Sequence, residues 1–135
     1  MNMRSHRGAV LLEFALVIAI LVALATGIAD AGIAFRIKHV LKVAAREGAR
    51  LASVQPNLKP NDPAVLKVVE EILKESDVNG ATATVKPGKP ATGSPVTVQV
   101  TFDYDPLFPA IGLGLGGTLT LQSATTMRYE VVGSS

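Results

Sequence analysis

The hydrophobic positions of this chain are concentrated near its N-terminus. Residues 14–29 contain no charged side chain, and the apolar run from Ala9 to Phe35 is interrupted only by Glu13 and Asp30. A helix rises about 1.5 Å per residue, so this run reaches about 40 Å and can cross a hydrocarbon core of about 30 Å. A small domain also has difficulty burying a helix that is apolar on all sides. We therefore predict a transmembrane helix over about residues 9–35.

Helical spacing continues beyond the apolar run as far as Val54, shortly before Pro56. The apolar positions of this continuation predict one face, made of Ile37, Val40, Leu41, Val43, Ala44 and Leu51. A second face carries a cation at every fourth position, namely Lys38, Lys42, Arg46 and Arg50. A single helix from Ala9 to Ser53 would be about 68 Å long. We interpret its basic face as solvated.

A short amphipathic helix is predicted after the proline-containing segment 56–60. Asp62 followed by Pro63 is typical of a helix N-cap and first helical position, and Asn79-Gly80 is a stop signal. Its apolar face would comprise Val65, Leu66, Val69, Ile72 and Leu73, and its polar face Lys67, Glu70, Glu71, Lys74 and Glu75. Such a helix packs its apolar face against a neighbouring element.

After this second helix, the spacing of the apolar residues changes from helical to alternating. Residues 81–85 form a weak candidate strand, whereas residues 95–105 and 118–132 alternate apolar and polar side chains clearly. One set of alternate positions holds Val96, Val98, Val100, Phe102 and Tyr104, and the other strand offers Leu119, Leu121, Met127, Tyr129 and Val131. We predict an α+β head over residues 55–135, with an antiparallel sheet of three or four strands covered by the apolar stripes of both helices.

Two short motifs resemble ligand-binding sequences, but neither is sufficient to predict a ligand site. Gly112, Gly114 and Gly117 match the G-x-G-x-x-G pattern, but strand-like residues follow and no βαβ unit surrounds them. We instead expect residues 106–117 to form an apolar loop that contacts a neighbouring subunit or plugs the head. Asp103 and Asp105 are too few ligands for calcium.

Composition excludes several classes of chemistry. The 135 residues include no cysteine and only two histidines, so a disulfide framework, a thiolate metal site and a histidine-based triad are not supplied. The net charge of +2 is too small to predict a nucleic-acid partner. No pair of catalytic carboxylates and no activated nucleophile emerges. We therefore predict a non-enzyme without catalytic residues, cofactor or metal.

The residues around Glu13 form a motif of their own. A short basic stretch ends at Gly8, a small residue, Ala9, follows, and the carboxylate of Glu13 stands four positions further on. This motif resembles the cleavage site of type IV pilins, where a dedicated peptidase cuts after the glycine. The resemblance implies that residues 1–8 are a leader and that Ala9 becomes the mature N-terminus. A carboxylate among packed apolar helices needs a cation, and the resemblance supplies the α-amino group of Ala9 on a neighbouring subunit, which would set the subunit register.

Small residues also recur along the apolar helix. A ridge at every fourth position comprises Ala15, Ala19, Ala23, Gly27 and Ala31. Small side chains let membrane helices approach one another closely, so we interpret this ridge as a helix-packing face. Gly27 and Gly32 weaken the helix locally, and the stretch between them is a candidate for bending or melting.

Three segments in order, residues 8–32, 44–53 and 123–130, resemble the TadE-like pilins or pseudopilins of tight-adherence (Tad/Flp) pili. The resemblance implies a structural subunit, either pilin or minor pilin, that is cleaved by prepilin peptidase and then joins or primes an extracellular adhesive filament. The implied partners are other pilin subunits, the peptidase, the inner-membrane pilus assembly machinery and, before assembly, membrane lipid. The implied location is the inner membrane and then the cell surface.

Two other interpretations remain open at this point. One is an uncleaved single-pass membrane protein whose extracytoplasmic head binds a partner. The other is a secreted domain released by cleavage between Ala31 and Gly32. Charge alone favours a cytoplasmic location for the head, because more cations follow the apolar run than precede it. The resemblance places the head outside.

Overall fold

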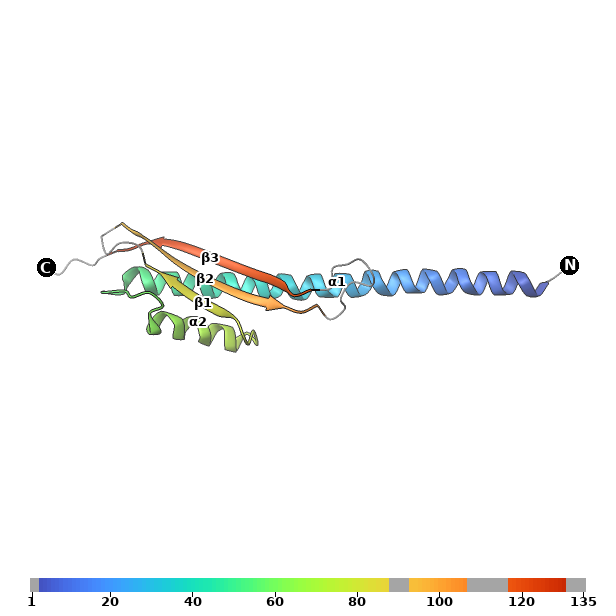
Figure 1. Cartoon of the computed structure of the whole chain (residues 1–135), viewed down its shortest axis with the longest axis horizontal. Coiled ribbons are helices and arrows are strands. Elements are labelled where there is room, and N and C mark those ends of the chain that lie inside the picture. Colours follow the sequence, from blue (N-terminus) through green and yellow to red (C-terminus); the bar gives the residue numbers. More distant parts are fainter. Residues whose placement is uncertain (1–2, 88–92, 107–116, 131–135) are drawn as a thin grey trace.

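The computed structural model describes residues 3–87, 93–106 and 117–130. Helix α1 (Met3–Val54) is followed by helix α2 (Pro63–Glu75) and strands β1 (Thr82–Lys86), β2 (Pro95–Tyr104) and β3 (Leu119–Arg128). Figure 1 shows that α1 extends far beyond the other elements, which gather along its C-terminal half. The predicted α+β architecture, with a long helix, a second helix and a small antiparallel sheet, is confirmed. The described part of the predicted loop is limited to its edges, and residues 107–116 lie outside the described residues.

The sheet has the order β1-β2-β3 and both neighbouring pairs are antiparallel. Val98 is opposite Val85 on one side and Thr125 on the other. Pairing extends past the end of β3, because the Tyr129 amide donates to the Ser94 carbonyl at 2.8 Å. Alternation places Val96, Val98, Val100 and Tyr104 on the buried face, as the sequence pattern predicted.

Both ends of α2 have identifiable causes. The Ala64 amide donates to Oδ1 of Asp62 at 3.0 Å, which is the expected N-cap, and Pro63 follows it. The helix ends at Glu75, before the Asn79-Gly80 signal. Asp77 adopts a left-handed φ of 59°, and the Val78 amide donates to the Leu73 carbonyl at 2.9 Å. This turn buries Val78, so the helix ends earlier than predicted because a hydrophobic side chain after it reaches the core.

The linker between the helices is tied to the sheet. The Asn61 amide donates to the Val85 carbonyl at 3.1 Å, and the Val85 amide donates to Oδ1 of Asn61 at 3.0 Å. Asn61 thus satisfies both backbone groups of Val85 on the side of β1 that faces away from β2. The left-handed φ of 53° at Asn61 is a conformation that asparagine tolerates well.

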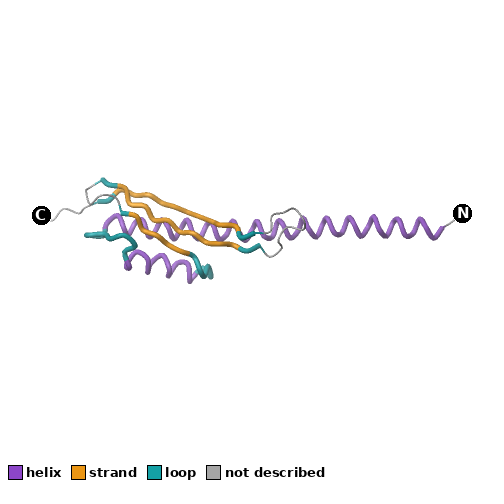
Figure 2. Tube along the Cα trace, viewed as in Figure 1, coloured by secondary structure: helices purple, strands orange, loops and turns teal. Residues whose placement is uncertain are grey.

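The core lies between α1, α2 and the sheet, and Figure 2 shows the strands running along the C-terminal half of α1. The face of α1 that the head covers is made mainly of small residues. Its fully buried members are Leu41, Ala44, Ala45, Ala49 and Ala52, and α2 and the sheet contribute Val65, Val69, Val85, Val96, Val98 and Val100. The sequence prediction was wrong for Val43, which is 41% exposed because the covered face is centred on the alanines.

Gly48 marks the closest approach of the head to α1. A Cβ atom at this position would lie 2.7 Å from Cγ2 of Val69 and 3.2 Å from Cγ1 of Val98. Both valines are fully buried and β-branched, so neither can rotate away freely. The glycine is therefore required by packing between α1, α2 and β2.

We predict that Gly48→Ala destabilises the head by about 1 kcal/mol, because overpacking of about 1–3 kcal/mol exceeds the gain in helix propensity of about 1 kcal/mol. The measurement is calorimetric unfolding of the full chain in detergent. Gly32→Ala is the matched control, since a Cβ there meets nothing within 4 Å. A Gly48→Ala protein as stable as the Gly32→Ala protein would contradict the close approach.

Candidate functional site

The N-terminal half of α1 is an uncovered apolar surface. Leu12 is 71% exposed and Phe14 is 63% exposed, and every described residue from Gly8 to Val22 is exposed. Within the described residues one helix, Gly8–Val54, is long and apolar enough to cross a membrane, and its most apolar 18-residue window is not buried. Such a surface is not stable in water, so it requires lipid or another apolar surface to cover it.

The predicted cleavage and register residues all lie on this surface. Gly8, Ala9 and Glu13 are exposed, and α1 begins at Met3, so the peptide between Gly8 and Ala9 lies within the helix. Glu13 follows Ala9 by four residues, about 6 Å along the helix axis. Among residues 8–87, 93–106 and 117–130, none forms a hydrogen bond or ion pair with Glu13. Its carboxylate therefore depends on a group outside the described chain when apolar surroundings cover it.

The predicted packing ridge is also accessible. Ala15, Ala19, Gly27 and Ala31 are exposed and Ala23 is half-buried. The structure contains one copy of the chain, so helix packing through the ridge stays a prediction. The helix is continuous through Gly27 and Gly32. The hydroxyl of Thr26 is satisfied within the helix, because its single hydrogen is shared between the Val22 carbonyl at 3.0 Å and the Ala23 carbonyl at 2.9 Å.

A polar contact that the sequence analysis missed fixes the near end of the sheet. The Tyr104 hydroxyl donates to Oδ1 of Asp30 at 3.1 Å, joining the last residue of β2 to the apolar run of α1. Burial of the phenol, followed by its hydrogen bond to Asp30 and the charge of that carboxylate, raises the pKa of Tyr104 above its ordinary value. The feature of the sequence that could have predicted this contact is Asp30 itself, since a charged residue in an apolar run needs a polar partner.

Further polar contacts fix the far end of the sheet. The Tyr129 hydroxyl donates to the Gln55 carbonyl at 2.6 Å, and the Glu130 amide donates to the Ser53 carbonyl at 2.8 Å. These bonds also satisfy carbonyls that the end of α1 leaves without helical partners. The sheet is thus attached to α1 at its two ends, through the last residue of β2 and through the residues that follow β3.

The distance between the two attachment points is about the same along the sheet as along α1. The ten residues of β2 span about 33 Å, and α1 rises about 35 Å between Asp30 and Ser53. The sheet therefore covers α1 from about residue 30 to its end and leaves the preceding residues uncovered. Within the described parts of the chain no three metal-ligating side chains come together.

This architecture defines a class of protein in which one helix provides an apolar surface for a membrane or a polymer and carries a small head at its other end. The comparisons with known proteins show which family the long helix resembles. The model of the TadE-like protein family matches residues 8–50. The chain is TadE-like over this segment, so the resemblance predicted from the sequence is confirmed for residues 8–50. Comparison with curated proteins and with solved structures gives no match.

The family match indicates a protein associated with Tad pili, and the apolar helix agrees with an association with the membrane. The matched residues include the predicted cleavage residues, Glu13 and the packing ridge. They also include Gly48, so the family segment extends from the uncovered apolar surface into the core of the head.

The raised pKa of Tyr104 predicts a loss of stability at alkaline pH. The neutral phenol contributes stability in full below the ordinary tyrosine pKa of about 10, and this contribution is lost as the pH rises through the raised pKa of the folded state. The chain has two tyrosines, so Tyr129→Phe leaves only Tyr104 to titrate. We expect the tyrosinate absorbance of this variant to have a midpoint above that of the same protein unfolded in guanidinium.

Asp30→Asn on the same background should lower the midpoint, because it removes the negative charge beside the phenol. Tyr104→Phe should cost about 1 kcal/mol at neutral pH through the lost hydrogen bond. Equal midpoints in the folded and unfolded proteins would contradict the contact.

Proposed function

We propose that this chain is a Tad pilus subunit, a pilin or minor pilin, that is cleaved after Gly8 by prepilin peptidase and assembled into, or used to prime, an extracellular adhesive filament. The observation that carries the proposal is the uncovered apolar half of α1 in a segment that matches the TadE-like family. Residues 1–8 act as the leader, 9–54 as the long helix with a membrane part over about 9–35, and 55–135 as the head.

The location of Glu13 supports polymerisation after the membrane stage. A carboxylate in a membrane helix costs roughly 2.5–3.5 kcal/mol at the centre and less near an end. In a polymer of packed helices this cost is offset if the α-amino group of Ala9 on a neighbouring subunit meets the carboxylate. Since both groups lie near the mature N-terminus, an axial shift by one turn would separate them. Glu13 and Ala9 thereby set the register between subunits.

The packing ridge gives neighbouring helices room to approach. Ala15, Ala19, Ala23, Gly27 and Ala31 present little side-chain bulk, so helices in the filament core or in the membrane can pack closely along them. The partners of the chain are then other pilin subunits, prepilin peptidase and the inner-membrane assembly machinery, with membrane lipid around the helix before assembly. The role is structural and non-catalytic, and the final location is the cell surface.

The competing function is an uncleaved single-pass membrane protein whose extracytoplasmic head binds a partner. The apolar surface alone is compatible with it, because lipid can cover the helix permanently. The N-terminus of the mature protein separates the two functions.

We predict that the protein purified from its native host begins at Ala9. N-terminal sequencing and intact mass are the measurements. A protein that begins at Met1 would favour the uncleaved membrane protein, and one that begins at Gly32 would indicate a secreted domain. Gly8→Leu should block cleavage and leave full-length protein in the membrane.

We further predict that Glu13→Gln impairs assembly without impairing membrane insertion, because it leaves the amino group of Ala9 without its carboxylate, at a cost of about 3–5 kcal/mol for each subunit contact. Glu13→Val should insert at least as well as the wild type. The measurements are the amounts of the protein in the membrane and in sheared pili. Glu130→Gln, an exposed site on the head, is the matched control. Normal pili from the Glu13→Gln chain would remove the register role.

A further inference from the structure

The apolar run of α1 is longer than a bilayer requires. It extends from Ala9 to Phe35, about 40 Å along the helix, whereas a hydrocarbon core is about 30 Å thick. Two stretches of about 30 Å fit within the run, residues 9–29 and residues 15–35. Hydropathy does not choose between them, because each contains one carboxylate, Glu13 in the first and Asp30 in the second. The contacts between the head and α1 favour the first.

Residues 14–29 need no contact with water. Thr26 is the only polar side chain in this stretch, and its hydroxyl hydrogen is shared between the carbonyls of Val22 and Ala23. The backbone groups of a continuous helix are satisfied within the helix, which is the condition for a segment surrounded by lipid. This stretch can therefore lie in hydrocarbon without further polar partners.

Polar contacts with the head begin at the next residue. Oδ1 of Asp30 accepts a hydrogen bond from the Tyr104 hydroxyl at 3.1 Å. Tyr104 ends β2 and is paired with Leu119, the first residue of β3, so the sheet ends near Asp30. At the same end the Thr120 hydroxyl donates to Oδ1 of the exposed Asp103 at 2.8 Å. Immersing this end in hydrocarbon would remove water from two carboxylates, which is costly.

The open edge of the sheet gives a second reason. Among the described residues β3 is paired with β2 alone, so its other edge presents backbone groups without strand partners. Open sheet edges do not occur within the hydrocarbon of a bilayer, because lipid offers these groups no hydrogen bond. A membrane part over residues 15–35 would draw the start of β3 into hydrocarbon by up to about 9 Å. The sheet therefore disfavours this stretch and favours residues 9–29.

Two large apolar side chains are exposed at this end of the head. Phe35 on α1 is 73% exposed, and Leu119 at the start of β3 is 50% exposed. Long side chains on a helix point back toward its N-terminus, so the Phe35 ring extends toward the apolar half of α1. We call Asp30, Phe35, Tyr104 and Leu119 the membrane-proximal end of the head. Aromatic and apolar side chains beside hydrogen-bonded polar groups are typical of the headgroup region of a bilayer.

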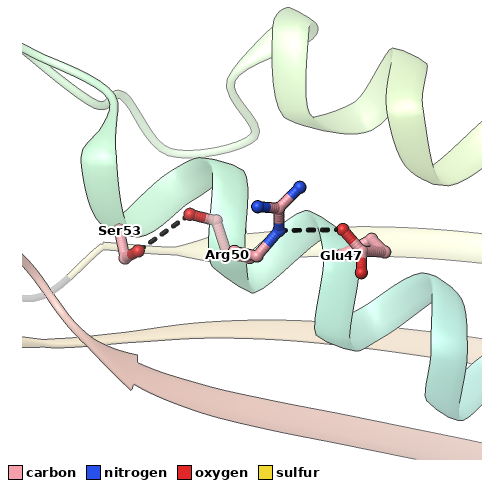
Figure 3. A network of polar contacts seen from close by, with 3 residues as sticks. All are labelled: Glu47, Arg50 and Ser53. Atoms are coloured by element: carbon pink, nitrogen blue, oxygen red, sulfur yellow. Dashed lines mark hydrogen bonds and ion pairs between the residues drawn. The ribbon is translucent and has the colours of Figure 1, made fainter.

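The far end of the head carries exposed charge. Figure 3 shows its contacts, in which Nε of Arg50 donates to Oε2 of Glu47 at 3.0 Å and Oγ of Ser53 donates to the Arg50 carbonyl at 2.8 Å. The Arg50 side chain is 76% exposed, so its charge is hydrated when this end lies in water. The two ends of the head thus suit different surroundings.

We propose that the hydrocarbon part of the membrane span ends at about Ala29 and that the membrane-proximal end of the head lies in the lipid headgroup region. The inference rests on the proposed function, because it assumes that α1 crosses the membrane before assembly. It narrows the membrane part from residues 9–35 to residues 9–29. The head then lies directly on the bilayer, and its position, more than the length of the apolar run, sets how deeply α1 is inserted.

The absence of tryptophan from the chain allows a direct measurement of depth. Full-length Phe35→Trp, Leu119→Trp and Ile20→Trp chains are placed in phosphatidylcholine vesicles that contain a lipid with a quencher on its headgroup or deep in its acyl chains. The headgroup quencher should cause the larger loss of fluorescence for Phe35→Trp and Leu119→Trp, and the deep quencher for Ile20→Trp. Val54→Trp, at the exposed far end of α1, is the matched control and should lose no fluorescence with either lipid.

Two results of this measurement would overturn the proposal. A larger loss of Phe35→Trp fluorescence with the deep quencher would mean that hydrocarbon extends to residue 35. No loss for either Phe35→Trp or Leu119→Trp, while Ile20→Trp responds to the deep quencher, would mean that the head stands away from the bilayer.

The absence of cysteine allows the boundary to be located independently. Ile28 and Gly32 are exposed on the same side of α1, about one turn apart, and a Cβ at Gly32 meets nothing within 4 Å. In the same vesicles Gly32→Cys should react with N-ethylmaleimide roughly tenfold faster than Ile28→Cys, because a thiol ionises and reacts in water. After unfolding in SDS and urea the two rates should be equal. Equal rates in vesicles would contradict a boundary at Ala29.

The results also distinguish this inference from the filament role. An Ile20→Trp chain that the deep quencher leaves unchanged would place α1 outside the bilayer and remove the membrane stage together with this inference. A protein that begins at Met1 and keeps the expected quenching would remove only the filament role. A start at Ala9 with pili, combined with deep quenching of Phe35→Trp, would remove only the position of the head.

Discussion

The close packing of the sheet against the small-residue face of α1 is the constraint on which the rest of the structure depends. Gly48 leaves no room for a Cβ atom beside Val69 and Val98, and Ala44 and Ala45, about one turn earlier on α1, are fully buried. Because the helix presents so little bulk here, α2 and β2 can both reach it, and the valines fill the remaining space. This packing aligns the strands with the helix and so determines where their ends meet it.

That alignment divides α1 into a C-terminal part that the head covers and an N-terminal part whose apolar surface is exposed. Tyr104 at Asp30 and Tyr129 at Gln55 attach the ends of the sheet, so the head covers the helix from about residue 30 onwards. Before that point the helix carries large exposed aliphatic side chains and no cover from the described head. One continuous helix thus joins an apolar surface to a packed head.

The charges of the chain contribute little to holding one copy together. The described residues contain a single ion pair, Glu47 with Arg50, in which the arginine side chain is 76% exposed. Exposed pairs of this kind contribute at most about 1 kcal/mol. The other charged side chains of the two helices are mostly exposed, as cations on α1 and as glutamates mixed with lysines on α2. Apolar packing therefore stabilises the head.

The sequence by itself determined the elements, because local periodicity does not depend on distant parts of the chain. The long apolar helix, the N-cap at Asp62 and the alternation along β2 were all readable, as was the TadE-like segment. Only the tertiary structure decided which residues meet. The bond between Tyr104 and Asp30 joins positions 74 residues apart, and the packing at Gly48 involves three elements at once. The left-handed Asp77 likewise follows from the burial of Val78. Such features depend on contacts between distant segments, which no local pattern specifies.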